Sequence, residues 1–322
     1  MTLISDSAKP AVTILLPTFS RAHYLPFALE SALQQTFQDF ELIILDDAST
    51  DDTEAVAARY VERDSRIRYV RHPHNLGITR NWRFGLEAAS GEFLCFLEDD
   101  DVFLPDFLEK MTAPLRRDPS LILSFCDHWN MDASGSRLHA RTEELSRVFR
   151  RNILAEGVVA DLVQTAILDT SIGITAAMFR REHLRSAFID DRALGGIDLW
   201  FLYQCAKTGR GGWYLPERLM EYRLHSAGMS HSMPALMGLG HLFLYEEALK
   251  DPANARLRPA LRKRFAETAA SRGIHLLQTE KPMEARRALR LSLRAKVTLR
   301  ALTACALTFL GMHGSSATST IR

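Results

Sequence analysis

Four consecutive acidic residues, Glu98 to Asp101, follow the apolar segment GEFLCFL at residues 91–97. Adjacent carboxylates repel one another, so such a cluster is costly unless a cation neutralises it. Carboxylate oxygens are the ligands that Mg²⁺ and Mn²⁺ prefer. The cluster therefore predicts a divalent cation that holds a diphosphate and neutralises it as a leaving group. A solvated acidic loop without a metal is the alternative.

A second acidic pair, Asp46 and Asp47, ends the apolar segment FELIILDD at residues 40–47. A carboxylate at this place can accept a hydrogen bond from the N–H of a nucleotide base and repel the wrong base. The following residues include Ser49 and Asp51, which are residue types that cap helices. On these residues alone, base recognition and a structural role in the turn are equally open.

Two later segments carry further candidate groups. Asp198 lies at the start of the apolar segment IDLW, where the positive end of a helix dipole favours a charged carboxylate that can act as a general base. A helix cap with no chemical role is the alternative. Arg223 and His225 lie in the segment YRLHS. Arginine side chains bind phosphate, and histidine side chains bind phosphate or a metal ion. The alternative is that both are ordinary surface residues near a turn.

The elements that position these residues alternate between strands and helices. Strands alternating with helices indicate βαβ units and a parallel sheet, in which ligands bind beyond the carboxyl ends of the strands. Both acidic groups lie at such ends. The apolar patterns predict strands at residues 11–16, 40–47, 67–71 and 91–97 and helices at residues 24–37, 53–63 and 78–89. Later strands are predicted at residues 121–126 and 174–179, loops and helix at residues 130–165, and a helix at residues 198–208.

The composition of the 322 residues is that of an ordinary globular protein, with 47% hydrophobic and 25% charged residues. The formal net charge of +1 and the lack of basic strands interleaved with aromatic residues give no support to a nucleic-acid partner. Residues 251–322 nevertheless contain 14 Lys or Arg and only 4 Asp or Glu. From about residue 236, Ala, Leu and Arg dominate. We therefore expect a main domain at residues 1–235 and a small, basic, helical extension at residues 236–322.

Residues 283–312 have the pattern of a basic amphipathic helix. Such a helix can lie on an anionic membrane surface, or it can expose a solvated face while it packs on the main domain. The apolar stretch from Leu302 to Met312 is shorter than the roughly 20 residues of a membrane-spanning helix. The basic side chains of this segment are Arg286, Arg287, Arg290, Arg294, Lys296 and Arg300.

The number and spacing of the cysteines indicate the redox state of the compartment in which the protein works. The four cysteines are widely spaced and contain no CxxC pair, which argues against a disulfide framework or a zinc site. A reducing compartment fits this pattern, and the N-terminus lacks the features of a signal peptide. We therefore expect a cytoplasmic protein that is either soluble or peripheral at the inner face of the membrane.

Several common enzyme classes lack their motifs. The sequence contains no G-x-G-x-x-G, no P-loop and no G-x-S-x-G. A phosphoacceptor receiver domain also ends a strand in paired acids, but it would leave residues 98–101 and Asp198 without a role. A metal-dependent nucleotidyltransferase would carry a glycine-rich basic loop after its first strand, where this chain has PTFSRAHY.

Five segments, taken in order, resemble family 2 glycosyltransferases of the GT-A fold. The resemblance covers roughly residues 11–231. It implies an α/β fold with a Rossmann-like, mostly parallel sheet flanked by helices. It also implies an inverting transfer of a sugar from a nucleotide-diphosphate sugar, with UDP favoured, to a hydroxyl of a glycan or lipid-linked acceptor in cell-surface polysaccharide assembly. The segments are VTILLPTFSR, LESALQQTFQDFELIILDDASTDDT, NLGITRNWRFGLEAASGEFLCFLEDDDVFLPDFLEK, GGIDLWFLYQCAKTG and YRLHSAGMS.

The same resemblance implies residue roles. It implies that Asp198 is the general base and that a divalent cation, Mn²⁺ or Mg²⁺, is the cofactor. It implies nucleotide contacts from Pro17, Thr18, Phe19, Arg21, Asp47 and Asp99, metal ligands from Asp100, Asp99 and His225, and diphosphate contacts from Arg223 and His225. A module of the same fold that binds a nucleotide sugar without turnover, and a nucleotidyltransferase, are the alternatives.

Overall fold

The computed structural model describes residues 9–226, 228, 234–279 and 281–309. The chain divides into two compact units, Met1–Ile189 with Phe201–Ser226 and Asp190–Trp200 with Ala227–Arg322. Residues 190–200 therefore belong with the C-terminal part of the chain, although they lie in the middle of the sequence. The functional division that we expect between residues 235 and 236 stays a prediction.

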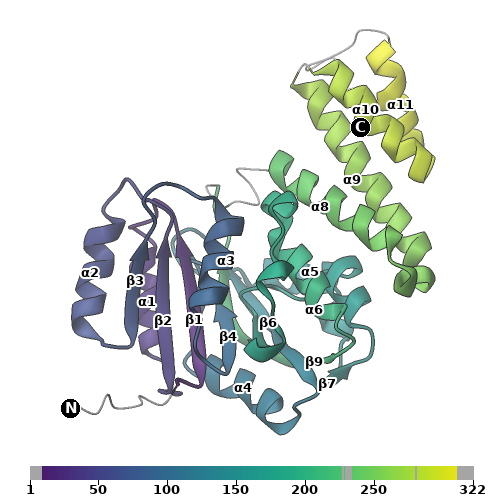
Figure 1. Cartoon of the computed structure of the whole chain (residues 1–322). Coiled ribbons are helices and arrows are strands. Elements are labelled where there is room, and N and C mark those ends of the chain that lie inside the picture. The colour runs from purple at the N-terminus through teal and green to yellow at the C-terminus, as the bar shows by residue number, and fades with distance from the viewer. Residues whose placement is uncertain (1–8, 227, 229–233, 280, 310–322) are drawn as a thin grey trace. The chain divides into compact units, whose positions relative to one another are not determined.

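The first unit contains a nine-stranded sheet in the order β3-β2-β1-β4-β8-β6-β9-β5, with β7 paired to β9 (Figure 1). The neighbours β3, β2, β1 and β4 are parallel, whereas β8 runs antiparallel to both β4 and β6. The alternating α/β organisation is confirmed. The strands are β1 Val12–Thr18, β2 Phe40–Asp46, β3 Ile67–Arg71, β4 Phe93–Phe96, β5 Val102–Phe103, β6 Leu121–Met131, β7 Gly157–Val159, β8 Ala177–Arg180 and β9 Gly211–Arg223.

Helices connect these strands. The four helices predicted at residues 24–37, 53–63, 78–89 and 198–208 have ends within four residues of the predicted ends. The helix at residues 107–117 was not predicted, and the helix at residues 139–148 falls in the segment predicted as loops and helix. The α-helices are α1 Leu25–Leu33, α2 Thr53–Arg63, α3 Ile78–Ala88, α4 Phe107–Arg117, α5 His139–Val148 and α6 Ile197–Ala206. Short 3₁₀ turns are η1 Arg151–Ile153, η3 Arg181–His183, η4 Ser186–Phe188 and η5 Asp191–Gly196, and η2 Gln164–Leu168 is a π-helical turn.

Both faces of the sheet are covered, as the continuous apolar strands predict. Successive side chains of a strand point to opposite faces. Ile14 and Leu16 belong to a core cluster with residues of α1, whereas Leu15 packs against α3. Gly85 of α3 lies so close to this face that an added Cβ would be 2.6 Å from Leu45 Cδ1 and 2.9 Å from Leu15 Cδ1.

The sequence patterns missed β5, β7 and β9. The segment GGWYLPERLMEYR of β9 contains two glycines, a proline and four charged residues, and its buried positions do not alternate. The strand forms because it pairs with β6, β5 and β7. Such pairings are long-range and override local propensity.

From Pro234 onward the described residues of the second unit are mainly helical, and the expected helical extension is confirmed. The expectation of one helix over residues 283–312 is wrong within the described residues, because the backbone of Lys296 is extended (φ −157°, ψ 126°) and ends α10. β-Branched Val297 and Thr298 follow it. None of the described helices is both long and apolar enough to span a bilayer. The helices are α8 Pro234–Lys250, η6 Pro252–Leu257, α9 Arg258–Gln278, α10 Pro282–Ala295 and α11 Leu299–Phe309.

Candidate functional site

The register of three parallel strands aligns their carboxyl ends. Thr18 of β1 pairs with Asp46 of β2. Leu15 pairs with Phe96 of β4, so the same register continued by three residues places Thr18 beside Asp99. The Thr18 hydroxyl donates a hydrogen bond to Asp99 Oδ2 at 2.7 Å. The strand ends therefore form one edge with two acids and a hydroxyl.

The antiparallel pairing of β5 with β9 brings the end of β9 to this edge. Val102 pairs with Glu221, and the register places Arg223 next to the residues before β5. The Arg223 backbone N–H donates to Asp101 Oδ1 at 3.0 Å, and Arg223 Nε donates to the Asp100 carbonyl at 2.8 Å. His225 Nε2 lies 2.8 Å from Asp100 Oδ2.

Arg21, in the loop after β1, joins these groups. Its Nη1 donates to Asp100 Oδ2 at 2.5 Å and lies 3.2 Å from His225 Nε2. Its Nε lies 3.9 Å from Asp99 Oδ1. The structure thus brings together Thr18, Arg21, Asp99, Asp100, Arg223 and His225.

The acidic cluster is held at a high electrostatic cost. Burial, and then repulsion by Asp100, raises the pKa of Asp99 to about 7, against the Arg21 charge and the Thr18 hydrogen bond. Burial and the neighbouring carboxylates also raise the pKa of Glu98 and of Asp101 well above their ordinary values. A site of this kind attracts a second positive charge.

The residues at this edge fit a divalent cation by their chemistry. Asp99, Asp100 and His225 offer carboxylate oxygens and an imidazole nitrogen. Across the described chain no three His, Cys, Asp or Glu side chains are already arranged as a ligand set. In the structure the Arg21 guanidinium supplies the positive charge between Asp99 and Asp100.

Asp47 lies at the next strand end and holds a loop. Its carboxylate accepts hydrogen bonds from the backbone N–H groups of Leu76 at 2.6 Å and Gly77 at 2.9 Å. Gly77 has a φ of +79°, which favours glycine. Of the other residues expected to contact a nucleotide, Pro17 is buried in β1 and Phe19 is 48% exposed.

Two non-glycine residues beside the site have left-handed backbone angles, Ser20 (φ 54°) and Ala48 (φ 63°). Side chains of the β2–α2 turn hold this arrangement in place. Ser49 Oγ accepts the Ser20 N–H at 2.8 Å. Asp51 Oδ2 accepts the Ala22 N–H at 2.9 Å, and Asp51 Oδ1 accepts the Thr53 N–H at 3.1 Å. Ser49 and Asp51 thus hold backbone within and beside the turn, whereas the N-cap residue of α2 is Asp52.

Asp198 belongs to the second unit, in the first turn of α6. We expected the helix dipole to favour its charged form, but burial raises the pKa of its carboxyl above the ordinary value. The neighbouring His241 of α8 opposes this rise, and burial lowers the pKa of His241. Within the described residues, neither Asp198 Oδ1 nor His241 Nε2 has a hydrogen-bond partner.

Glycines allow α8 to approach the segment before Asp198. A Cβ at Gly240 would lie 1.9 Å from the Ala193 carbonyl oxygen and 2.6 Å from Gly196 N. A Cβ at Gly196 would lie 2.9 Å from His241 Cδ2. Backbone therefore packs on backbone at this point.

A family model described as "Glycosyl transferase family 2" matches residues 13–185, which is more than half of the chain. The chain belongs to this family. The strands and turns that carry Thr18, Asp47, Asp99 and Asp100 all lie within the matched residues.

Curated relatives agree with this family assignment. The chain is 39% identical over 103 residues to the Campylobacter jejuni "GalNAc(5)-diNAcBac-PP-undecaprenol beta-1,3-glucosyltransferase", covering 32% of this chain and 33% of the relative. The chain thus spans about a third of the length of the first curated relatives that it matches.

Two solved structures share the fold at 18% sequence identity each. The mannosyltransferase PcManGT from Pyrobaculum calidifontis, in complex with GDP-Man and Mn²⁺, has a TM-score of 0.61 and covers 98% of this chain and 84% of its own. S. aureus TarS 1-349, in complex with UDP-GlcNAc, has a TM-score of 0.64 and covers 92% of this chain and 85% of its own. The expected GT-A fold is confirmed.

The sequence patterns missed two side chains of this chain, the Tyr24 ring and the His241 imidazole. The Tyr24 ring lies 4.9 Å from the His225 ring and 4.9 Å from the Arg223 guanidinium carbon. Tyr24 lies in the quoted segment PTFSRAHY, so its position after β1 was a usable signal. His241, in GLGH, had only its neighbouring helical glycines as a signal.

The hydrogen bond from Thr18 to Asp99 gives a direct test of the edge. We expect Thr18→Val to lower the free energy of unfolding by about 1.5–3 kcal/mol, because a buried carboxylate loses its donor. Urea denaturation measures the change. Thr18→Ser keeps the hydroxyl and is the matched control; an equal loss in both variants would assign the effect to packing.

Proposed function

We propose that this family 2 glycosyltransferase moves a sugar from a nucleoside-diphosphate sugar, preferably a UDP-sugar, to an acceptor hydroxyl with inversion. The observation that carries the proposal is the convergence of Thr18, Arg21, Asp99, Asp100 and His225 at one edge of the sheet. Cationic and acidic groups held together in this way suit a charged diphosphate and its counter-ion.

In this proposal the chain's own residues bind and orient the donor. Asp47 recognises the base from the next strand end, with Pro17, Thr18 and Phe19 beside it. Arg223 and His225 contact the diphosphate oxygens. Asp198 removes the proton from the acceptor hydroxyl, the acceptor oxygen bonds to the anomeric carbon, and the bond to the nucleoside diphosphate breaks. General-base assistance of this kind contributes about 10²–10⁴-fold.

Asp99, Asp100 and His225 would hold Mn²⁺ or Mg²⁺. Such an ion offsets the negative charge of the departing diphosphate. Two facts support this part of the proposal: the raised pKa of the buried Asp99, and the Mn²⁺ in the complex of PcManGT.

For the acceptor we propose a glycan or lipid-linked sugar of cell-surface polysaccharide assembly. The name of the Campylobacter relative includes an undecaprenol-linked saccharide. We place the reaction in the cytoplasm, at the inner face of the membrane. All four cysteines are free thiols, which suits a reducing compartment.

Donor binding can be tested without an acceptor, by thermal shift with UDP, dTDP, GDP and CDP, each with and without Mn²⁺. A nucleotide at 100 times its dissociation constant raises the free energy of unfolding by about 2.7 kcal/mol. For a chain of 322 residues this corresponds to a rise in Tm of about 4–6 °C. We expect a Mn²⁺-dependent shift with UDP. A shift with another nucleotide would reassign the base, and no shift with any would refute the donor site.

A further inference from the structure

The most exposed large apolar side chains of the described residues lie in the second unit. Two of them, Val297 and Leu299, lie together at the turn from α10 to α11, whereas Met283 lies at the other end of α10. Leu299, Val297 and Met283 are 81%, 66% and 64% exposed. Leu291 and Leu302 are about half exposed as well. Exposed apolar side chains that cluster in this way mark an interaction surface.

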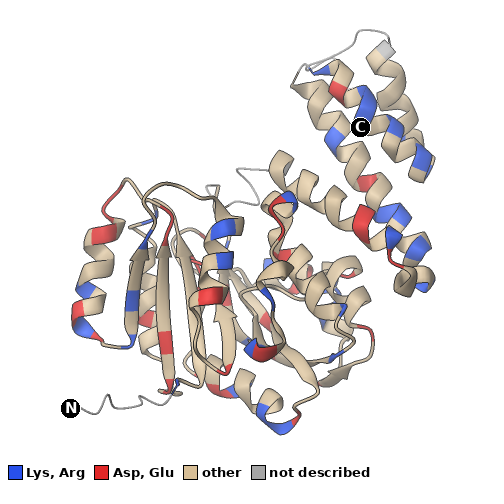
Figure 2. Ribbon diagram, in the orientation of Figure 1, with Lys and Arg blue, Asp and Glu red and all other residues tan. Residues whose placement is uncertain are grey.

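Cations share this surface. On α10, Arg287, Arg290 and Arg294 follow helical spacing and are exposed, opposite the buried Ala285, Ala288, Leu289 and Ser292. Figure 2 shows further Lys and Arg along α9, α10 and α11. Arg286 differs, because its Nη2 donates to the Thr308 carbonyl at 2.7 Å and joins α10 to α11.

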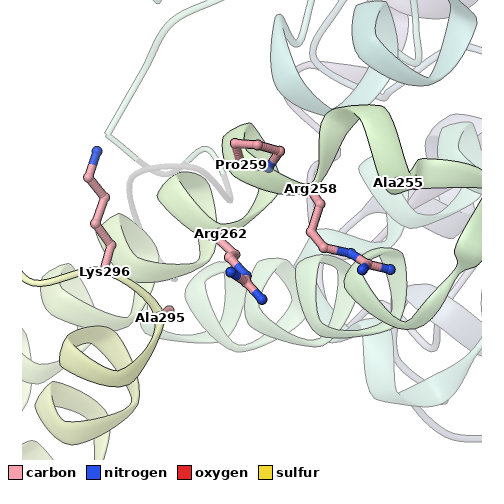
Figure 3. Close-up of a pocket in the computed structure, with 6 residues that line it drawn as sticks. All are labelled: Ala255, Arg258, Pro259, Arg262, Ala295 and Lys296. Atoms are coloured by element: carbon pink, nitrogen blue, oxygen red, sulfur yellow. The ribbon is translucent and has the colours of Figure 1, made fainter.

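An open surface hollow of about 470 Å³ adjoins the linker at residues 296–298 between α10 and α11. Ala295 and Lys296 line it on one side, and Val297 follows them directly. Arg258 and Arg262 line it from α9, and Figure 3 shows their side chains extending side by side while Lys296 extends away from them. The remaining lining residues are Ala255 and Pro259.

In the part of the chain that the structure describes, these cations have no acidic partner within ion-pair distance. Among the described residues, no ion pair involves Arg287, Arg290, Arg294, Arg258, Arg262 or Lys296. Glu284 is the one acidic residue between positions 282 and 302. The surface therefore combines positive charge with exposed apolar groups, which is the pattern of a helix that lies at a membrane interface.

We propose that this surface, formed by α10, the linker at residues 296–298, Leu299 at the start of α11 and the start of α9, docks on an anionic lipid bilayer. Val297 and Leu299 enter the acyl boundary, and Arg287, Arg290 and Arg294 contact the headgroup layer. A lipid phosphate occupies the hollow between Arg258 and Arg262. Charge complementarity selects an anionic bilayer, since a neutral protein surface would leave these cations unpaired.

The test is flotation of the full chain with vesicles of phosphatidylglycerol and phosphatidylcholine, compared with phosphatidylcholine alone. We expect binding to the anionic vesicles only, weakening with salt. One cation near an anionic membrane surface raises the binding constant about fivefold. The triple variant Arg287→Glu/Arg290→Glu/Arg294→Glu therefore lowers the binding constant by about 100-fold or more. Val297→Asp/Leu299→Asp lowers it at least about tenfold. Arg258→Ala/Arg262→Ala lowers it by an order of magnitude.

Arg147→Glu/Val148→Asp is the matched control, because both residues are exposed on α5 of the first unit; it keeps wild-type binding. Thermal unfolding shows that each variant folds. Flotation independent of lipid charge, absence of flotation, or equal loss in the control overturns the proposal. Thermal stabilisation by inorganic phosphate without flotation replaces it with a free-anion site, and self-association abolished by Val297→Asp/Leu299→Asp replaces it with a dimer surface. None of these outcomes depends on the donor site.

Discussion

Asp198→Asn is expected to abolish glycosyl transfer and to leave nucleotide binding unchanged. Asparagine has the shape of aspartate but cannot take a proton from the acceptor hydroxyl. The loss in kcat should be at least about 10³-fold, within the usual range for a removed general base. Transfer assays with UDP-sugars measure kcat, and thermal shift measures UDP binding.

The matched control for this variant is Asp191→Asn, the same chemical change at an exposed residue of the same unit. It should keep both activities. Equal loss of transfer and of nucleotide binding in Asp198→Asn would contradict the role as base and indicate a structural role.

The raised pKa of Asp198 adds a pH dependence to this prediction. A base must be deprotonated, so the rate falls as the pH drops through the raised pKa of the carboxyl. The acid limb of the kcat profile should therefore lie above the ordinary aspartate pKa of about 3.9. His241 opposes the rise of the Asp198 pKa. An acid limb of the kcat profile at or below the ordinary aspartate pKa would mean that Asp198 is not the base.

Gly240→Ala should have the largest effect on stability. The added Cβ would lie 1.9 Å from the Ala193 carbonyl oxygen and 2.9 Å from Gly196 Cα. Both atoms are backbone, so neither can move aside as a flexible side chain would. We expect the free energy of unfolding to fall by about 3 kcal/mol or more, measured by urea denaturation.

Gly238→Ala tests whether the effect is local. Gly238 is two residues earlier on α8, and an added Cβ there meets nothing within 4 Å. Alanine has a higher helix propensity than glycine, so the free energy of unfolding of this variant should rise by up to about 1 kcal/mol. Destabilisation of the same size in both variants would assign the loss to α8 itself and contradict the close packing on residues 193–196.

The edge formed by Thr18 and Asp99 could be predicted from the sequence. Short apolar runs define parallel strands, and parallel strands end at one edge, so the acids after them must meet there. The approach of Arg223 and His225 to this edge had no local signal. It depends on the two residues of β5 and their pairing with β9, and β9 lacks a strand pattern.

The surroundings of Asp198 were also beyond sequence patterns. A helix start was readable from the apolar run after it, but burial and His241 determine its pKa, and these come from the packing of α8 on η5. Likewise, the basic pattern of residues 283–312 was correct in composition, whereas the break after α10 was not foreseen. The extended Lys296 and its β-branched neighbours set that break.

The interleaving of the two units limits how far this chain is modular. Residues 190–200 belong to the C-terminal unit, so the chain passes between units at residues 189, 200 and 226. A protein shortened to residues 1–235 would keep Ala193, Trp200 and the segment between them but lose most of α8. The Trp200 ring packs against Phe243 of α8, with the ring centroids 4.7 Å apart. The C-terminal helices therefore cannot be exchanged between relatives, or removed to obtain a minimal enzyme, without replacing residues 190–200 at the same time.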